Sequence, residues 1–66
     1  MILTINGEKT EIPTAMTVTE LLEHLKIEPA RVAVEVNMKI VKRDTFQGHT
    51  LRDGDIIEIV NFVGGG

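Results

Sequence analysis

The residues best suited to chemistry are the last three, Gly64, Gly65 and Gly66. Glycine has no Cβ, so a run of glycines adds no packing surface and is costly to order. We expect residues 64–66 to be a thin, flexible tail that carries an α-carboxylate away from a folded domain, residues 1–63. Such a tail can enter a narrow enzyme channel. A frayed end or an added linker is the alternative, and we favour a native end because the glycines follow a strand directly, without serines or a tag.

Two histidines and two aspartates are weaker candidates for a chemical role. His24 and His49 lie far apart in the sequence and lack acidic residues at ligand spacing, so we interpret both as solvated side chains. Asp53 and Asp55 flank a turn glycine but lack the further oxygen ligands of a cation loop. We therefore predict no catalytic residue and no metal site.

The composition excludes several classes of function. The chain has 66 residues, no cysteine, no tryptophan or tyrosine and a net charge of −3. The lack of cysteine excludes disulfides, thiolate zinc sites and a cysteine nucleophile. Few aromatic residues and an acidic balance argue against nucleic-acid binding, and no apolar run approaches the ~18 residues of a membrane span. Without a signal peptide, we expect a cytoplasmic domain that has no active-site pocket of its own.

The first part of the chain predicts a β-hairpin followed by a helix. Apolar and polar residues alternate on either side of Asn6-Gly7, a dipeptide that tolerates positive φ in tight turns. The residues that follow are apolar at helical spacing and begin with a Thr17/Glu20 capping box. We expect a helix of about 8–10 residues that cannot continue past Pro29 and must pack on a sheet to be stable.

The rest of the chain predicts further strands around that helix. Residues 32–36 alternate and indicate a central strand, 40–41 a short strand, and 56–62 the last strand. Residues 43–50 indicate an irregular segment anchored by Phe46. This order predicts an α+β domain with one helix on one face of a mixed sheet. Its predicted core consists of Leu3, Ile5, Leu21, Leu22, Val34, Ile57 and Ile59.

The outward face of the last strand is a predicted partner surface. A carboxylate is rarely buried unpaired, so Glu58 should face solvent. Alternation then directs Val60 and Phe62 to the same outer face and the adjacent isoleucines toward the helix. Together with Val63 they form an apolar patch that we interpret as a contact surface, although scattered surface hydrophobes are ordinary on any protein.

Three cations elsewhere have no assigned role. We leave their interpretation open between contacts with an acidic partner surface and ordinary solvated charges. They are Lys42, Arg43 and Arg52.

Four features of the chain point to one family. They are the Asn6-Gly7 turn, the helix start at residues 17–22, the Asp53-Gly54-Asp55 turn before an apolar strand, and the final Gly65-Gly66. Together they resemble the ubiquitin-like β-grasp sulfur carriers, and the resemblance covers the whole chain. Residues 34–43 and 58–66 are most similar to the thiamine-biosynthesis group, the ThiS family. The resemblance implies a β-grasp fold with a four- to five-stranded mixed sheet.

The resemblance also implies a function: a sulfur carrier for the thiazole of thiamine, a protein co-substrate rather than an enzyme. In the family, a ThiF-type adenylyltransferase uses ATP to adenylate the terminal glycine carboxylate, here that of Gly66. A persulfide donor then supplies sulfur, and the resulting thiocarboxylate delivers it to a ThiG-type thiazole synthase. Gly64 and Gly65 would give unhindered access to Gly66, and the carrier itself would bind no cofactor. Two alternatives stay open: a carrier of the molybdopterin-synthase small-subunit type, and a non-covalent β-grasp interaction module.

Overall fold

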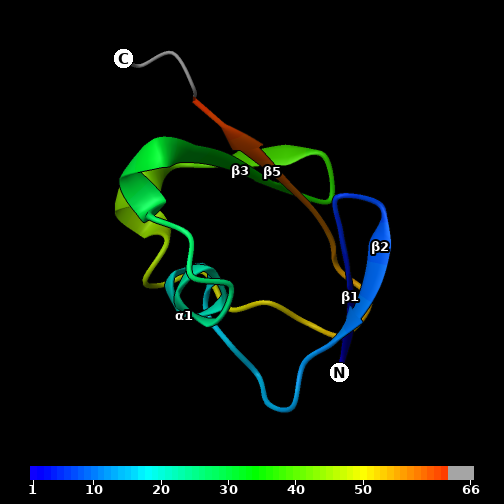
Figure 1. The fold of residues 1–66 in the computed structure, drawn as a ribbon. Coiled ribbons are helices and arrows are strands. Elements are labelled where there is room, and N and C mark those ends of the chain that lie inside the picture. The colour runs from blue at the N-terminus through cyan, green and yellow to red at the C-terminus, as the bar shows by residue number, and fades with distance from the viewer. Residues whose placement is uncertain (63–66) are drawn as a thin grey trace.

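A five-stranded mixed sheet with one α-helix across one face forms the fold in the computed structural model, which describes residues 1–62 (Figure 1). The strands lie in the order β2-β1-β5-β3-β4, with β1 and β5 parallel and the other neighbours antiparallel. The expected α+β, β-grasp class is thereby confirmed, with five strands. Its elements are β1 (Ile2–Ile5), β2 (Glu8–Glu11), α1 (Val18–His24), β3 (Val32–Val36), β4 (Lys39–Val41) and β5 (Ile56–Asn61), with short 3₁₀ turns at Pro29–Arg31 and Arg43–Thr45.

The middle position of the sheet belongs to β5, the last strand in the sequence. The strand at 32–36, predicted to be central, is indeed paired on both sides, by β4 and by β5. The alternation of its valines confirms the period-two pattern, since Val32, Val34 and Val36 are all buried. Because β5 holds β1 on one side and β3 on the other, it joins the two hairpins into one sheet.

Two tight turns close these hairpins with the same backbone geometry. The predicted Asn6-Gly7 turn has φ values of 49° and 85°, the left-handed values that such turns require. The turn between β3 and β4 repeats them at Asn37 and Met38, with φ values of 53° and 70°. The sequence did not predict the second turn, because methionine is not a residue that favours positive φ.

The predicted capping box starts α1. The Glu20 backbone N–H donates to Thr17 Oγ1 at 3.2 Å, and the Thr17 backbone N–H donates to Glu20 Oε1 at 2.9 Å. Two backbone donors at the helix start are thus satisfied by side chains.

The helix has 7 residues and ends earlier than predicted. Lys26 adopts a left-handed conformation, φ 60°, directly after the last turn. The Lys26 N–H donates to the Glu23 carbonyl at 3.0 Å and the Ile27 N–H to the Leu22 carbonyl at 2.9 Å, which is a Schellman motif. This motif, rather than Pro29, ends the helix. Glycine is the usual residue at such a position, so its absence hid the helix end from sequence inspection.

The core fills the space between α1 and the inner face of the sheet. Five of the predicted core residues are buried, whereas Ile5 and Ile59 are partly buried at its rim. Phe46 and Leu51, from the segment between β4 and β5, are also buried in this core. The buried set is Leu3, Ile12, Val18, Leu21, Leu22, Val32, Val34, Val36, Val41, Phe46, Leu51 and Ile57. In the described residues, no helix is long and apolar enough to cross a membrane.

Candidate functional site

The base of β5 is fixed by the turn that precedes it. The Ile2 backbone N–H donates to Asp53 Oδ1 at 2.6 Å, and the Gly54 N–H donates to the Ile2 carbonyl at 2.7 Å. Asp55 accepts at Oδ2 from the Arg52 backbone N–H at 2.9 Å. The carboxylates of Asp53 and Asp55 therefore stabilise the turn. Among the described residues, no group of three potential metal ligands occurs.

Two asparagine side chains extend the sheet on either side of β5. Asn6 Oδ1 accepts from the Ile59 N–H at 2.7 Å, and Asn6 Nδ2 donates to the Ile59 carbonyl at 3.2 Å. Asn37 Oδ1 accepts from the Ile56 N–H at 2.9 Å, while the Asn37 N–H donates to the Ile56 carbonyl at 2.7 Å. Each asparagine thus pairs with β5 like one more strand residue, Asn6 through both groups of its side-chain amide and Asn37 through its side-chain oxygen and its backbone N–H. Sequence reasoning treated Asn6 as a turn residue only and did not single out Asn37.

The far end of β5 is held by two arginines. The Phe62 backbone N–H donates to the Arg31 carbonyl at 2.8 Å, so pairing with the β3 side continues beyond the strand itself. The guanidinium carbon of Arg43 lies 6.0 Å from the centroid of the Phe62 ring, a cation–π distance. Arg43 also donates to the carbonyls of Pro29 at 3.3 Å and Val32 at 3.4 Å. One of the three unassigned cations therefore positions the segment that leads to the predicted tail.

The outer face of β5 has the predicted register. Glu58 is exposed, and Val60 and Phe62 are 55% and 51% exposed. Ile57 is buried on the opposite, inner face of the sheet. On this face Glu58 lies directly opposite Glu35 of β3. The exposure expected for Val60 and Phe62 is confirmed, and their role as a partner surface stays a prediction.

The predicted modification site lies beyond the described residues. Val63, Gly64, Gly65 and Gly66 are outside residues 1–62, and so is the boundary predicted between domain and tail. The described structure instead shows what precedes them: a central strand whose hydrogen bonds reach Ile59 on the β1 side and Phe62 on the β3 side. The segment that leads to the predicted reactive carboxylate of Gly66 is therefore held in place on the domain as far as Phe62.

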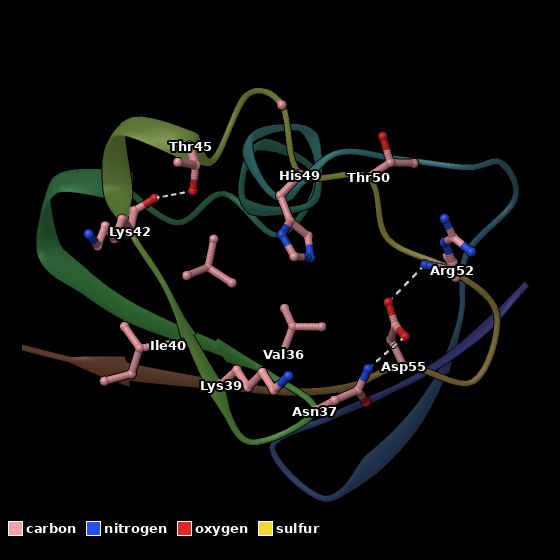
Figure 2. A pocket seen from close by; sticks show the side chains of 12 residues that line it. Val36, Asn37, Lys39, Ile40, Lys42, Thr45, His49, Thr50, Arg52 and Asp55 are labelled. Carbon is pink, nitrogen blue, oxygen red and sulfur yellow. Dashed lines mark hydrogen bonds between the residues drawn. The ribbon is translucent and has the colours of Figure 1, made fainter.

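The two histidines lie on different elements. His24 is exposed at the end of α1, whereas His49 is half-buried and lines an open depression beside β4 (Figure 2). The depression has a volume of about 860 Å³. The sequence did not predict it, because its lining residues, which lie between positions 36 and 55, come together only when the segment after β4 folds back toward that strand.

Comparisons with known proteins agree with one another. The ThiS family model matches residues 3–66. The sulfur carrier protein ThiS of Escherichia coli is 33% identical over 66 residues, which is 100% of both chains. A crystal structure of the thiamine biosynthesis protein ThiS from Geobacter metallireducens superposes with a TM-score of 0.88 at 39% identity, again over 100% of both chains. A thiazole synthase of Paramagnetospirillum magneticum is 44% identical over 66 residues, and the present chain spans 20% of its length.

Proposed function

The chain belongs to the ThiS family of sulfur carriers, and on this basis we propose that it carries sulfur for thiazole formation in thiamine biosynthesis on the carboxylate of Gly66. The observation that carries the proposal is the family match, which extends over residues 3–66 and so includes the three glycines. The protein acts as a co-substrate of partner enzymes rather than as an enzyme.

The first chemical step is activation of the carboxylate. A carboxylate is a poor electrophile because attack on it must displace oxide from an anionic, resonance-stabilised group. In the proposed step, a Gly66 carboxylate oxygen attacks the α-phosphorus of ATP within a ThiF-type adenylyltransferase. Pyrophosphate leaves, and the product is an acyl-adenylate whose leaving group is AMP. ATP is thus bound and used by the partner.

Sulfur enters in the second step. The outer sulfur of a protein persulfide attacks the acyl carbon and AMP leaves, which joins the carrier to the donor through an acyl disulfide. The thiolate of a second cysteine then attacks the donor's own sulfur in the acyl disulfide, which forms a disulfide between that cysteine and the donor and releases the carrier as a terminal thiocarboxylate. The carrier needs no thiol of its own for this route, in keeping with its lack of cysteine.

The fold supports this role by presenting the tail from a fixed strand. Hydrogen bonds hold β5 in place. They come from the side chains of Asn6 and Asn37 and from the Phe62 backbone N–H, which donates to the Arg31 carbonyl. Val60 and Phe62 then offer an apolar surface directly before the tail. We assign this surface to contact with the activating enzyme or the sulfur acceptor.

The proposed sulfur acceptor is thiazole synthase. A protein named thiazole synthase contains a stretch that is 44% identical to this chain and occupies 20% of its length. A carrier and an acceptor joined in one polypeptide meet at high effective concentration, and such fusion is expected of proteins that work together. The same matches favour the thiamine branch over the molybdopterin-synthase branch.

Two altered tails test the proposal. One variant lacks Gly66, and the other is the full chain made by chemical synthesis with a carboxamide in place of the Gly66 carboxylate. We expect both to lose adenylyltransferase-dependent ATP–pyrophosphate exchange, because neither presents the reactive group at the right position. Glu11→Gln, on the far edge strand β2, is the matched surface control and should exchange like the wild type.

The sulfur itself is detected in the tryptic peptide of residues 53–66. This peptide contains no methionine, so an oxygen-for-sulfur exchange cannot be confused with methionine oxidation, which adds nearly the same mass. Full exchange activity of the carboxamide would overturn the proposal and favour a non-covalent interaction module. Circular dichroism should show both variants folded, because residues 64–66 add nothing to the predicted core.

A further inference from the structure

The depression beside β4 has an apolar floor and a basic rim (Figure 2). The buried side chains of Val36 and Val41 are among the lining residues. In Figure 2 the His49 ring points into the space above Val36. Lys42 and Arg52 lie on opposite sides of the opening in Figure 2. The site is separate from the outer face of β5, since Val36 and Val41 belong to the inner face of the sheet.

The charge of this depression opposes that of the whole chain. The net charge is −3, yet three of the seven lysines and arginines line the depression and only one of the ten acidic residues does. That acid, Asp55, accepts hydrogen bonds from the Arg52 backbone N–H and, at 3.0 Å, from the Asn37 amide. A local excess of positive charge on an acidic protein favours an anionic occupant.

The edge of the sheet runs along the same depression. β4 pairs with β3 only, and within residues 1–62 no backbone hydrogen bond joins its other side to another segment. An open edge of this kind is a template for an added strand. Lysines on a short edge strand often serve only to prevent such pairing. Here, however, Met38 and Ile40 expose 89% and 75% of their side chains beside the edge, which favours contact rather than repulsion.

We propose that the β4 edge and its depression bind an extended acidic segment of a partner protein. The segment adds to β4 as a further strand, so that its alternate side chains enter the depression and its carboxylates face Lys39, Lys42 and Arg52. Charges set on opposite sides of an apolar floor suit carboxylates spaced along a chain. A compact phosphate would instead require donors that converge on one point.

The probe is a fluorescently labelled peptide of alternating glutamate and valine, compared with a peptide in which glutamine replaces every glutamate. We expect the acidic peptide alone to bind, with affinity that falls as salt is raised. Lys39→Glu/Lys42→Glu should weaken its binding at least about tenfold. The matched control, Lys9→Glu/Lys26→Glu, changes the net charge equally and should lie within about threefold of wild type, because both lysines are exposed on other elements.

Strand addition is tested separately from charge. A peptide N-methylated at alternate residues cannot donate along one edge, and we expect it to lose binding when the methyl groups face β4. In the complex, amide hydrogen exchange should slow in residues 39–41 and remain unchanged in β2. The Gly66 carboxamide should bind the peptide like the wild type, so this proposal and the proposed function can fail independently.

Three results would overturn the inference. The first is equal binding of the acidic and the glutamine peptides, or no binding at about 1 mM. The second is an unchanged affinity in Lys39→Glu/Lys42→Glu, which would place the peptide elsewhere. The third is binding of tripolyphosphate but not of the peptide, which would assign the depression to a small anion.

Discussion

The two β-hairpins flank β5 on opposite sides and close with the same backbone geometry, but they use different residues. The β1–β2 turn places asparagine and glycine at positive φ, the residues best suited to it. The β3–β4 turn places Asn37 and Met38 there, with Met38 at φ 70° and 89% exposed. A left-handed conformation is unfavourable for methionine, and in the described structure its side chain makes no buried contact that would offset the strain.

The comparison distinguishes turn residues that stabilise the fold from a turn residue, Met38, whose presence the stability of the fold does not explain. In both turns the asparagine reaches β5 through its side chain, so the first turn position serves the sheet in the same way twice. The second position differs: Gly7 relieves strain, whereas Met38 retains it and exposes an apolar side chain next to the β4 edge. The strain at Met38 therefore lies where the structure offers a docking surface.

The largest expected effect follows loss of either asparagine. Asn6→Ala and Asn37→Ala should each lower the free energy of unfolding by about 2 kcal/mol, since each places alanine at positive φ and removes two side-chain hydrogen bonds. Asn6 makes both of its bonds to Ile59 of β5, and Asn37 makes one to Ile56 of β5 and one to Asp55. Urea unfolding followed by far-UV circular dichroism measures this. Asn6→Gly and Asn37→Gly keep the backbone favourable and should lose only about 1 kcal/mol. Equal losses for alanine and glycine would show that the left-handed backbone contributes nothing.

A smaller loss is expected at the favourable turn. Gly7 has φ 85°, and a Cβ added there meets nothing within 4 Å, so Gly7→Ala strains the backbone without a clash. We expect a decrease of about 1 kcal/mol in the free energy of unfolding, measured in the same urea titration. No loss would mean that the first turn adapts more readily than its geometry indicates.

The smallest effect is expected at the unfavourable turn, and its sign is opposite. Met38→Gly should raise the free energy of unfolding by about 0.5 kcal/mol, because relief of the left-handed strain exceeds the entropy that glycine adds to the unfolded chain. Met38→Leu, which keeps the strain and the apolar side chain, is the control. A loss of stability in Met38→Gly would show that the methionine packs in a way that its exposure does not reveal.

Local signals in the sequence predicted most of the fold. The Asn6-Gly7 turn, the Thr17/Glu20 capping box and the strand alternation all depend on residues a few positions apart. The end of α1 and the β3–β4 turn were hidden because Lys26 and Met38 adopt conformations that their types disfavour.

The site was only partly predictable for a different reason. The exposure of Val60 and Phe62 followed from alternation on one strand, and Gly66 as the reactive residue came from the resemblance to sulfur carriers. The hydrogen bonds between the Asn6 side-chain amide and the Ile59 backbone join residues 53 positions apart, and no local sequence pattern encodes them. The depression beside β4 was missed although its lining residues lie between positions 36 and 55, because they come together only when the segment after β4 folds back toward that strand.

The central place of β5 has a consequence for how the protein is made. Ribosomes release both hairpins before β5, and an isolated hairpin is marginally stable in water. Contacts between β1 and β5 span most of the chain, so the sheet closes late, when β5 inserts between its two neighbours. The outer surface of Val60 and Phe62 therefore exists only on a finished fold. An activating enzyme that recognises this surface would select intact carriers and pass over unfolded copies, a form of quality control that needs no separate chaperone.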